Sequence, residues 1–157
     1  MESRLSNPAD LVPELTEIAA ALFKAVGNGS VPRTTMTLMH LRAGQLAGST
    51  YLTVMHTGIL RKAGESEERI TAVASWRDAP YFTEAERAAL ALAEAVLTPN
   101  PDGERVSDDL YAEVSRHYDD KAIATLTMAI GQVCFFLPVA LVGKPVPGVS
   151  PATQWRK

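Results

Sequence analysis

Hydrophobic residues recur at three- and four-residue intervals over most of this chain, and that spacing predicts amphipathic helices. The first apolar stripe runs between Leu15 and Val26. Asp10 is a good N-cap residue, and Pro13 falls in the first turn, where a proline is tolerated. The run Gly27-Asn28-Gly29 is a typical helix terminator. The pattern therefore predicts a helix that begins at Asp10 and ends at Val26.

Six further helices follow from the same reasoning, because glycine, proline or a capping side chain bounds each apolar stripe. Thr83 and Glu86 have the T-x-x-E spacing of a capping box, which is the clearest start signal. No stretch alternates as a half-buried strand would. The sequence therefore predicts an all-α protein, a bundle of about six to seven helices. The expected ranges are residues 32–47, 49–63, 66–76, 83–97 and 107–117, and a long helix from Asp119 or Asp120.

The last expected helix is unusually apolar. Residues 122–142 contain no charged side chain, and the run is long enough to span a bilayer. Thr125, Gln132 and Pro138 dilute its apolar character, and no cluster of lysine or arginine flanks it. A helix that is apolar on every face lies either in a membrane or at the centre of a packed bundle. The flanks favour a buried bundle helix, which Pro138 should kink.

Composition narrows the class of protein. The chain has 157 residues, 46% of them hydrophobic, one cysteine and a formal net charge of -3. These values exclude intrinsic disorder and an internal disulfide, and they give no electrostatic footprint for nucleic acid. The first ten residues lack the apolar core of a secretory signal. We expect a cytoplasmic protein without a nucleic-acid or membrane partner. It should have one helical domain over residues 1–148 and an irregular tail over residues 149–157.

Two segments resemble a known family. Residues 41–56 read L-R-A-G-Q-L-A-G-S-T-Y-L-T-V-M-H. This segment resembles the carboxymuconolactone decarboxylase family, most closely its AhpD-like alkylhydroperoxidase branch, with the block L-R-x-S-Q-x-N-G-C-x-x-C-x-x-x-H. Residues 76–92, W-R-D-A-P-Y-F-T-E-A-E-R-A-A-L-A-L, resemble a second family block, and K-P-V-P-G at residues 144–148 is a weaker echo. The resemblance implies an AhpD-like helical protomer that assembles as a homotrimer or a hexamer.

The first block departs from the family at the positions that carry its chemistry. In the peroxidase branch, a glutamate, two cysteines and a histidine form a redox pair with a proton relay. The matching positions here are Thr37, Ser49, Leu52 and His56. Serine and leucine cannot form a disulfide, and threonine cannot act as a carboxylate base. The resemblance therefore implies a pocket around Thr37, Ser49 and Leu52 without thiol peroxidase chemistry. The sequence leaves open whether Ser49 lines that pocket or only caps a helix.

His56 is the candidate catalytic residue. An imidazole can act as a general acid or base near neutral pH. The alternative is a hydrogen-bonded core histidine that supports no turnover, and the spacing identifies no carboxylate partner for it. We interpret His40 and His117 as structural or solvated.

The remaining candidate groups favour structural roles. We interpret Cys134 as a buried, inert thiol and not as a relocated peroxidatic one. Arg42 and Arg77 recur in the family blocks, and we expect them to form ion pairs that position helices, with an anion clamp as the alternative. The sequence has no metal-ligand spacing, so we expect neither a metal site nor a cofactor.

Three functions follow from these observations. The first is a family member without the redox cysteines that binds a small apolar organic molecule, with His56 catalysing proton transfer or decarboxylation. The second is a non-catalytic binding or assembly protein on the same scaffold. The third is residual alkylhydroperoxidase activity through Cys134. In each case the apolar last helix should leave surface for contact with further copies of the chain.

Overall fold

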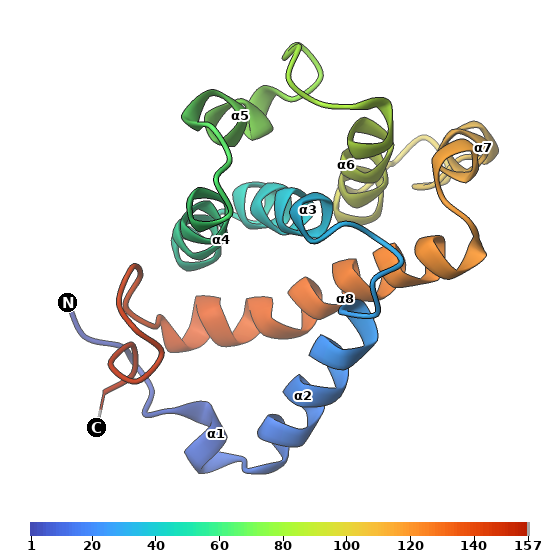
Figure 1. The fold of residues 1–157 in the computed structure, drawn as a ribbon. Helices are drawn as coiled ribbons and strands as arrows, with labels where there is room; N and C mark the ends of the chain where they lie inside the picture. Colours follow the sequence, from blue (N-terminus) through green and yellow to red (C-terminus); the bar gives the residue numbers. More distant parts are fainter. Residues whose placement is uncertain (157) are drawn as a thin grey trace.

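The computed structural model describes residues 1–156, and its secondary structure is helical. The described residues form eight α-helices and one 3-10 turn, with a single isolated backbone bridge between Ser6 and Arg156. The expected all-α class is thus confirmed (Figure 1). The elements are α1 (Pro8–Leu11), α2 (Glu14–Val26), α3 (Arg33–Leu46), α4 (Thr50–Lys62), α5 (Glu67–Ala72), η1 (Val73–Ser75), α6 (Glu84–Leu97), α7 (Asp108–His117) and α8 (Asp120–Gly143).

The first expected helix is divided in two, so its predicted start at Asp10 is wrong. Asn7 caps α1 by accepting a hydrogen bond from the Ala9 amide, and Asp10 lies inside that short helix. Val12 then leaves the helical conformation, with φ -131° and ψ 86°. The residue before a proline is pushed out of the α region by the proline ring. Pro13 therefore breaks the stripe, and α2 begins after it.

The segment between α4 and α6 contains less α-helix than the pattern predicts. The expected helix over residues 66–76 is only six residues of α5 followed by the 3-10 turn η1. This turn places Val73 and Trp76 in the same buried cluster as Leu60. The predicted capping box at the start of α6 is confirmed, because Thr83 and Glu86 make both of its hydrogen bonds.

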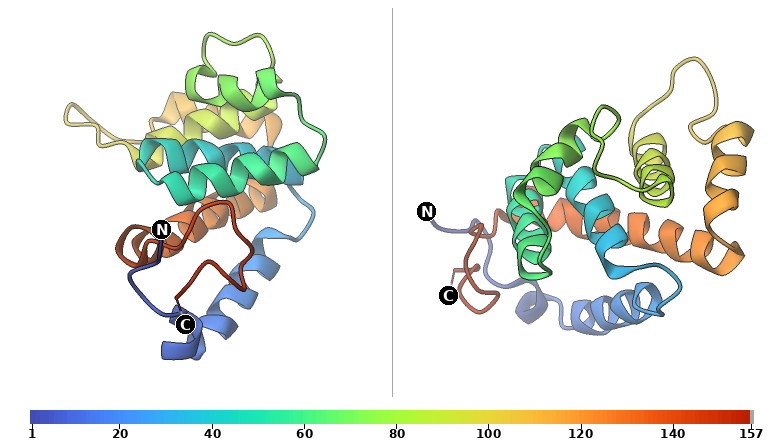
Figure 2. Two further views of the ribbon diagram at one scale, coloured as in Figure 1. Left: turned by 90° about the vertical axis from the view of Figure 1, so that its left-hand side faces the viewer. Right: turned by 45° about the horizontal axis from the view of Figure 1, so that its top comes forward.

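Helix α3 is the centre of the bundle. It contacts α4, α6 and α8, and each of the three apolar clusters includes one or more of its residues. Helices α3 and α4 form an antiparallel hairpin through a turn at Gly48, whose φ of 64° favours glycine. The two helices approach closely at Gly44, where an added Cβ would lie 3.0 Å from the Cβ of Leu52. Figure 2 shows the hairpin from two further sides.

Helix α8 runs along this hairpin and contacts α2, α3, α4, α6 and α7. The helix is buried on one side, because only 39% of its most apolar 18-residue stretch is buried. Leu126 and Val133 face the bundle, whereas Met128, Phe135 and Val142 are exposed. By length and composition alone this helix could cross a membrane. Helix α8 therefore packs against the bundle with one face, whereas the sequence predicts a helix that is buried at the centre of the bundle.

The two ends of the chain pack on each other at the end of α8. The Arg4 amide donates to the Gly143 carbonyl at 2.8 Å, and the Arg156 amide donates to Ser3 Oγ at 2.7 Å. The Trp155 ring lies against Gly143, where a Cβ would meet it at 2.8 Å. Figure 1 shows both termini on the same side of the molecule. Both terminal segments therefore lie at the C-terminal end of α8.

Candidate functional site

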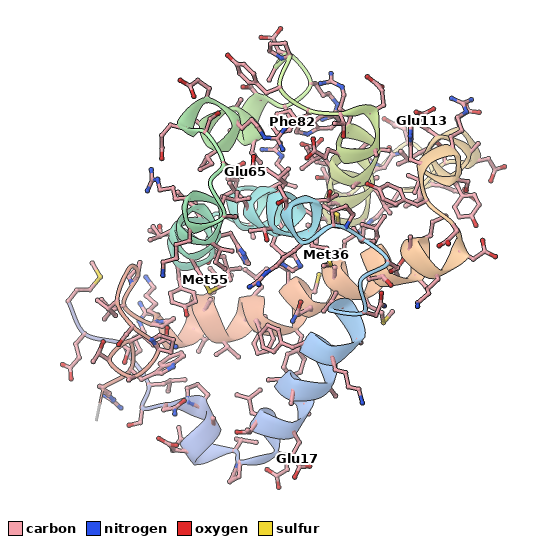
Figure 3. All side chains as sticks on the ribbon, in the orientation of Figure 1. Glu17, Met36, Met55, Glu65, Phe82 and Glu113 are labelled. Atoms are coloured by element: carbon pink, nitrogen blue, oxygen red, sulfur yellow. The ribbon has the colours of Figure 1, made fainter. Side chains whose placement is uncertain are left out.

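An open cleft of about 1020 Å³ lies among α2, α3, α4 and α8, with the chain ends at its border. Apolar side chains dominate its lining. In Figure 3, Met36 of α3 and Met55 of α4 lie on the side of the hairpin that faces α8. Further apolar residues of the lining are Leu15, Ala19, Phe23, Leu52, Ile59, Val133, Phe136, Val139 and Trp155. The polar side chains of the lining therefore lie in largely apolar surroundings.

Two histidines of the hairpin meet at this cleft. The rings of His40 in α3 and His56 in α4 have centroids 5.0 Å apart, with an angle of 56° between their planes. His40 Nε2 lies 3.0 Å from the Ala129 carbonyl of α8. A carbonyl only accepts hydrogen bonds, so His40 carries its proton on Nε2. Both rings line the cleft.

Both imidazoles are neutral at physiological pH. Burial lowers the pKa of His56, and together with the smaller effect of a protonated His40 it brings this pKa to about 3. Burial also lowers the pKa of His40, against the opposite effect of its bond to Ala129. A charged imidazole is disfavoured in such surroundings because nothing replaces its lost hydration. The histidine pair is therefore an uncharged polar feature of an apolar cleft.

Two buried polar atoms of the cleft have no hydrogen-bond partner among the described residues. They are Nδ1 of His56 and Nε2 of Gln132. These side chains are 7% and 5% exposed. A buried polar atom without a partner destabilises the fold, and it commonly marks a position with another role.

The positions matched to the family's redox residues are placed differently. Thr37, Leu52 and His56 line the cleft, and Ser49 is not among its lining residues. The Thr37 hydroxyl donates to the Arg33 carbonyl at 2.9 Å. Ser49 is the N-cap of α4, where its hydroxyl accepts a hydrogen bond from the Leu52 amide. The hairpin thus gathers three of the four positions at the cleft.

The sequence predicts a structural or solvated His40, and the half-buried His40 does make a structural contact with the Ala129 carbonyl. Sequence reasoning did not place its ring against His56. A usable signal was present, because His40 and His56 lie eight residues before and after Gly48. Residues equidistant from the turn of an antiparallel helical hairpin lie opposite each other. Gly44 and Leu52, four residues on either side, meet in the same way.

Arg42 and Arg77 form the expected ion pairs, both with Glu94 of α6. Arg42 Nε donates to Glu94 Oε1 at 2.5 Å, Arg77 donates to Oε2, and Trp76 Nε1 donates to Oε1 at 2.9 Å. Burial alone would raise the pKa of the Glu94 carboxyl, but hydrogen bonds from Arg77, Trp76 and Arg42 hold it below its usual range. These contacts join α3, α6 and the segment after η1, so both arginines have the helix-positioning role that was expected.

The expectation that Cys134 is buried is wrong. Cys134 is exposed on α8. Its neighbours Gln132 and Val133 face the cleft, whereas Cys134 and Phe135 lie on the face of α8 that points away from the bundle. The buried residues of α8 are those on the face that packs against the bundle, and an apolar stretch of sequence does not by itself show which residues these are. Cys134 is not among the residues that line the histidine cleft.

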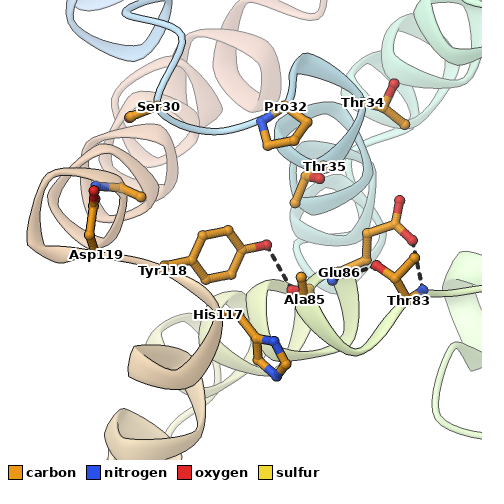
Figure 4. Close-up of a pocket in the computed structure, with 11 residues that line it drawn as sticks. Ser30, Pro32, Thr34, Thr35, Thr83, Ala85, Glu86, His117, Tyr118 and Asp119 are labelled. Atoms are coloured by element: carbon orange, nitrogen blue, oxygen red, sulfur yellow. Dashed lines mark hydrogen bonds between the residues drawn. The ribbon is translucent and has the colours of Figure 1, made fainter.

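A second pocket of about 470 Å³ lies where the start of α3 meets α6 and the α7–α8 junction (Figure 4). Several of its polar groups have partners within the protein. The Tyr118 hydroxyl donates to the Ala85 carbonyl at 2.8 Å, and Glu86 accepts from Arg69 at 2.7 Å. His117 lies 3.2 Å from a Glu113 carboxylate oxygen. No group of three metal-ligating side chains occurs within residues 1–156. The histidine cleft is therefore the stronger candidate site.

A model of the carboxymuconolactone decarboxylase family matches residues 13–95. The chain belongs to the carboxymuconolactone decarboxylase family. It is 34% identical over 125 residues to the uncharacterized protein YdfG of Bacillus subtilis, covering 79% of this chain and 83% of that protein. It is 39% identical over 66 residues to the uncharacterized protein YnjA of Escherichia coli, covering 42% of this chain and 35% of that protein.

Solved structures share the fold of this family member. A protein of unknown function from Agrobacterium tumefaciens, suggested to be an antioxidant defence protein AhpD, superposes with a TM-score of 0.83 and 29% identity, over 95% of this chain and 100% of that one. The debrominase Bmp8 superposes with a TM-score of 0.74 and 20% identity, over 90% of this chain and 74% of that one. A cysteine-to-alanine variant of Bmp8, in complex with 2,3,4-tribromopyrrole, has a TM-score of 0.75. The AhpD-like helical fold expected from the sequence is confirmed.

Proposed function

We propose that this family member binds a small, largely apolar organic molecule in the cleft beside His56. The observation that carries the proposal is an apolar cleft of about 1020 Å³ with the buried, neutral His56 in its wall. Small-molecule sites in proteins have this character, with mostly apolar walls and a few polar groups that orient the ligand. The positions of the family's cysteine pair hold Ser49 and Leu52, so the proposal includes no thiol chemistry.

The charge of the lining favours a neutral or an anionic ligand. Among the described residues, the cleft has no carboxylate, and Arg33 at its exposed rim is the one fully charged side chain. A cationic ligand would lose its hydration without gaining a counter-charge. The fold relative Bmp8 has been crystallised with 2,3,4-tribromopyrrole, and this supports the idea that the shared fold can hold a small organic ring.

Methyl resonances of methionine can test the binding directly. We would add α-methylstyrene, a small apolar ring compound, to protein with labelled methionine methyl groups. Met36 and Met55 line the cleft, whereas Met128 is exposed on α8 outside it. Shifts at Met36 and Met55, without a shift at Met128, support the proposal. Saturating amounts of the probe that leave Met36 and Met55 unchanged would contradict it.

A matched pair of variants on α2 locates the probe. Ala19 lines the cleft, and Ala20 is exposed outside it. Ala19→Phe should fill part of the cleft and weaken binding of α-methylstyrene, while Ala20→Phe should not. Equal affinities in the two variants would show that the probe binds elsewhere and would refute the cleft as the binding site.

Proton transfer by His56 is the second function that we propose. The observation that favours it is the neutral state of His56, since a neutral imidazole is already in its basic form. Its pKa of about 3 makes it a weak base, so binding is the better supported of the two functions. The test is exchange of the methyl hydrogens of acetophenone in D₂O. Wild-type exchange above that of a His56→Phe variant supports catalysis, and equal exchange favours the non-catalytic binding protein.

Self-association is proposed as well, as a homotrimer or a hexamer in the cytoplasm. Its support is the exposed apolar face of α8, where Met128, Phe135, Leu141 and Val142 are 48%, 39%, 43% and 62% exposed. Contiguous apolar surface commonly marks an interface between chains. Sedimentation equilibrium should give a multiple of the 16.9 kDa chain mass. A monomer at micromolar concentration would contradict the proposal.

A further inference from the structure

Gln132 is the second polar side chain that the apolar cleft leaves without a partner. It lies on α8, is 5% exposed and lines the cleft, and its Nε2 has no hydrogen-bond partner among the described residues. Nε2 carries two N–H donors and cannot accept. Leaving both donors unmade in a buried position destabilises the protein, and a leucine of similar size would avoid this penalty.

The neighbouring polar groups of α8 show that the helix can satisfy such groups where the structure requires it. One turn earlier, the Ala129 carbonyl accepts from His40 Nε2 at 3.0 Å. Two turns earlier, the Thr125 hydroxyl accepts from Asn28 at 2.8 Å and from Ser30 at 2.9 Å. Gln132 differs from both, because it faces a cleft of about 1020 Å³ and not a packed loop or helix. The terminal amide turns about a broad torsion, so its N–H groups can reach an atom placed in the cleft.

We infer that Gln132 donates a hydrogen bond to an uncharged carbonyl oxygen of the bound molecule and so selects its class. The ligand atom that meets Nε2 is an acceptor, because Nε2 only donates. It should be uncharged because the groups around it are neutral and Arg33 lies at the exposed rim, so a buried carboxylate would have no counter-charge. The class is that of small ketones, aldehydes or amides with an apolar ring or chain. The inference rests on the proposed binding function of the cleft.

Two probes of equal shape isolate the carbonyl. Acetophenone and α-methylstyrene differ in that a carbonyl oxygen of the first is a methylene group in the second. Their dissociation constants would be measured by methionine methyl titration for wild type, Gln132→Leu and Gln132→Met. Gln45→Leu is the matched control, because Gln45 also has a buried unpartnered amide atom but does not line the cleft.

The expected result is a wild-type preference for acetophenone of roughly three- to tenfold, the range of one neutral hydrogen bond. Both Gln132 variants should lose the preference while binding α-methylstyrene as wild type does, and Gln45→Leu should keep it. A preference that survives both Gln132 substitutions, or that wild type lacks, overturns this inference and leaves the proposed function intact. If neither probe binds wild type, the proposed function itself fails. Gln132→Met keeps the test valid if the leucine variant does not fold.

Discussion

His40 and His56 lie against each other across the α3–α4 hairpin, with ring centroids 5.0 Å apart and an angle of 56° between the ring planes. They come from helices that meet at a turn eight residues from each of them. No carboxylate among the described residues lines the cleft that they share, so a proton on either ring would be a charge without a counter-charge in apolar surroundings. Protonation of the pair should therefore lower the free energy of unfolding, and the protein should be less stable in acid.

The first prediction concerns stability in acid. Burial is the main cause that lowers the pKa of His56 to about 3, from its ordinary value of 6.5. At a pH between these two pKa values, the unfolded chain binds a proton at this residue and the folded chain does not. The free energy of unfolding therefore falls as the pH drops. At pH 5 this one residue should remove about 2 kcal/mol relative to pH 7. Urea unfolding at several pH values measures the slope.

His56→Phe should make the free energy of unfolding less dependent on pH, because it keeps an aromatic ring against His40 and removes the titrating group. His117→Asn is the control, since it removes an exposed histidine that lies outside the cleft. Identical slopes in wild type and His56→Phe between pH 5 and pH 7 would show that His56 is not the responsive group.

The second prediction concerns the ion pairs of Glu94. Its carboxylate accepts from Arg42, Trp76 and Arg77, and its side chain is 11% exposed. Glu94→Gln should therefore lower the free energy of unfolding by about 2–3 kcal/mol, because two arginines lose their charged partner. The Arg61–Glu67 pair is the control, as its side chains are 56% and 57% exposed. Glu67→Gln should leave the free energy of unfolding almost unchanged, because water screens an exposed ion pair. Similar losses in both variants would refute the distinction.

The third prediction compares two helical glycines. An added Cβ at Gly44 would lie 3.0 Å from Leu52 Cβ and 3.1 Å from the Thr53 nitrogen, whereas at Gly58 nothing lies within 4 Å. Gly58→Ala should raise the free energy of unfolding by about 0.5–1 kcal/mol, because alanine favours the helix. Gly44→Ala should lose this gain and destabilise the protein, because α3 and α4 must move apart. A gain at Gly44 equal to that at Gly58 would show that the hairpin is not tightly packed.

The fourth prediction concerns peroxide chemistry. Cys134 is exposed on α8 and does not line the histidine cleft. Cys134 is the one cysteine of the sequence, so the chain has no second thiol to resolve an oxidised Cys134. Consumption of a hydroperoxide with a dithiol donor should be the same for wild type and Cys134→Ala, at the rate of the donor alone. A cysteine-dependent rate would restore the peroxidase function that we rank last.

The local parts of the fold could be predicted because their causes lie within a few residues of each other. The Thr83–Glu86 capping box starts α6 through bonds between positions three residues apart. Gly48 ends α3 because its left-handed conformation suits glycine. The missed break before Pro13 has an equally local cause in Val12, and the sequence contained it. Helix periodicity and family blocks together also predicted the all-α class and the position of His56.

The face that each helix buries was decided only by the tertiary structure. Cys134 and Gln132 lie two residues apart in the same apolar run, yet one is exposed and the other faces the cleft. His40 acquires its role from a helix that packs opposite it, and the cleft exists because α2 and the chain ends lie alongside α8. Spacing along one helix shows which residues share a face. It does not show what covers that face, because the covering groups come from distant parts of the chain and are chosen by the packing of the whole bundle.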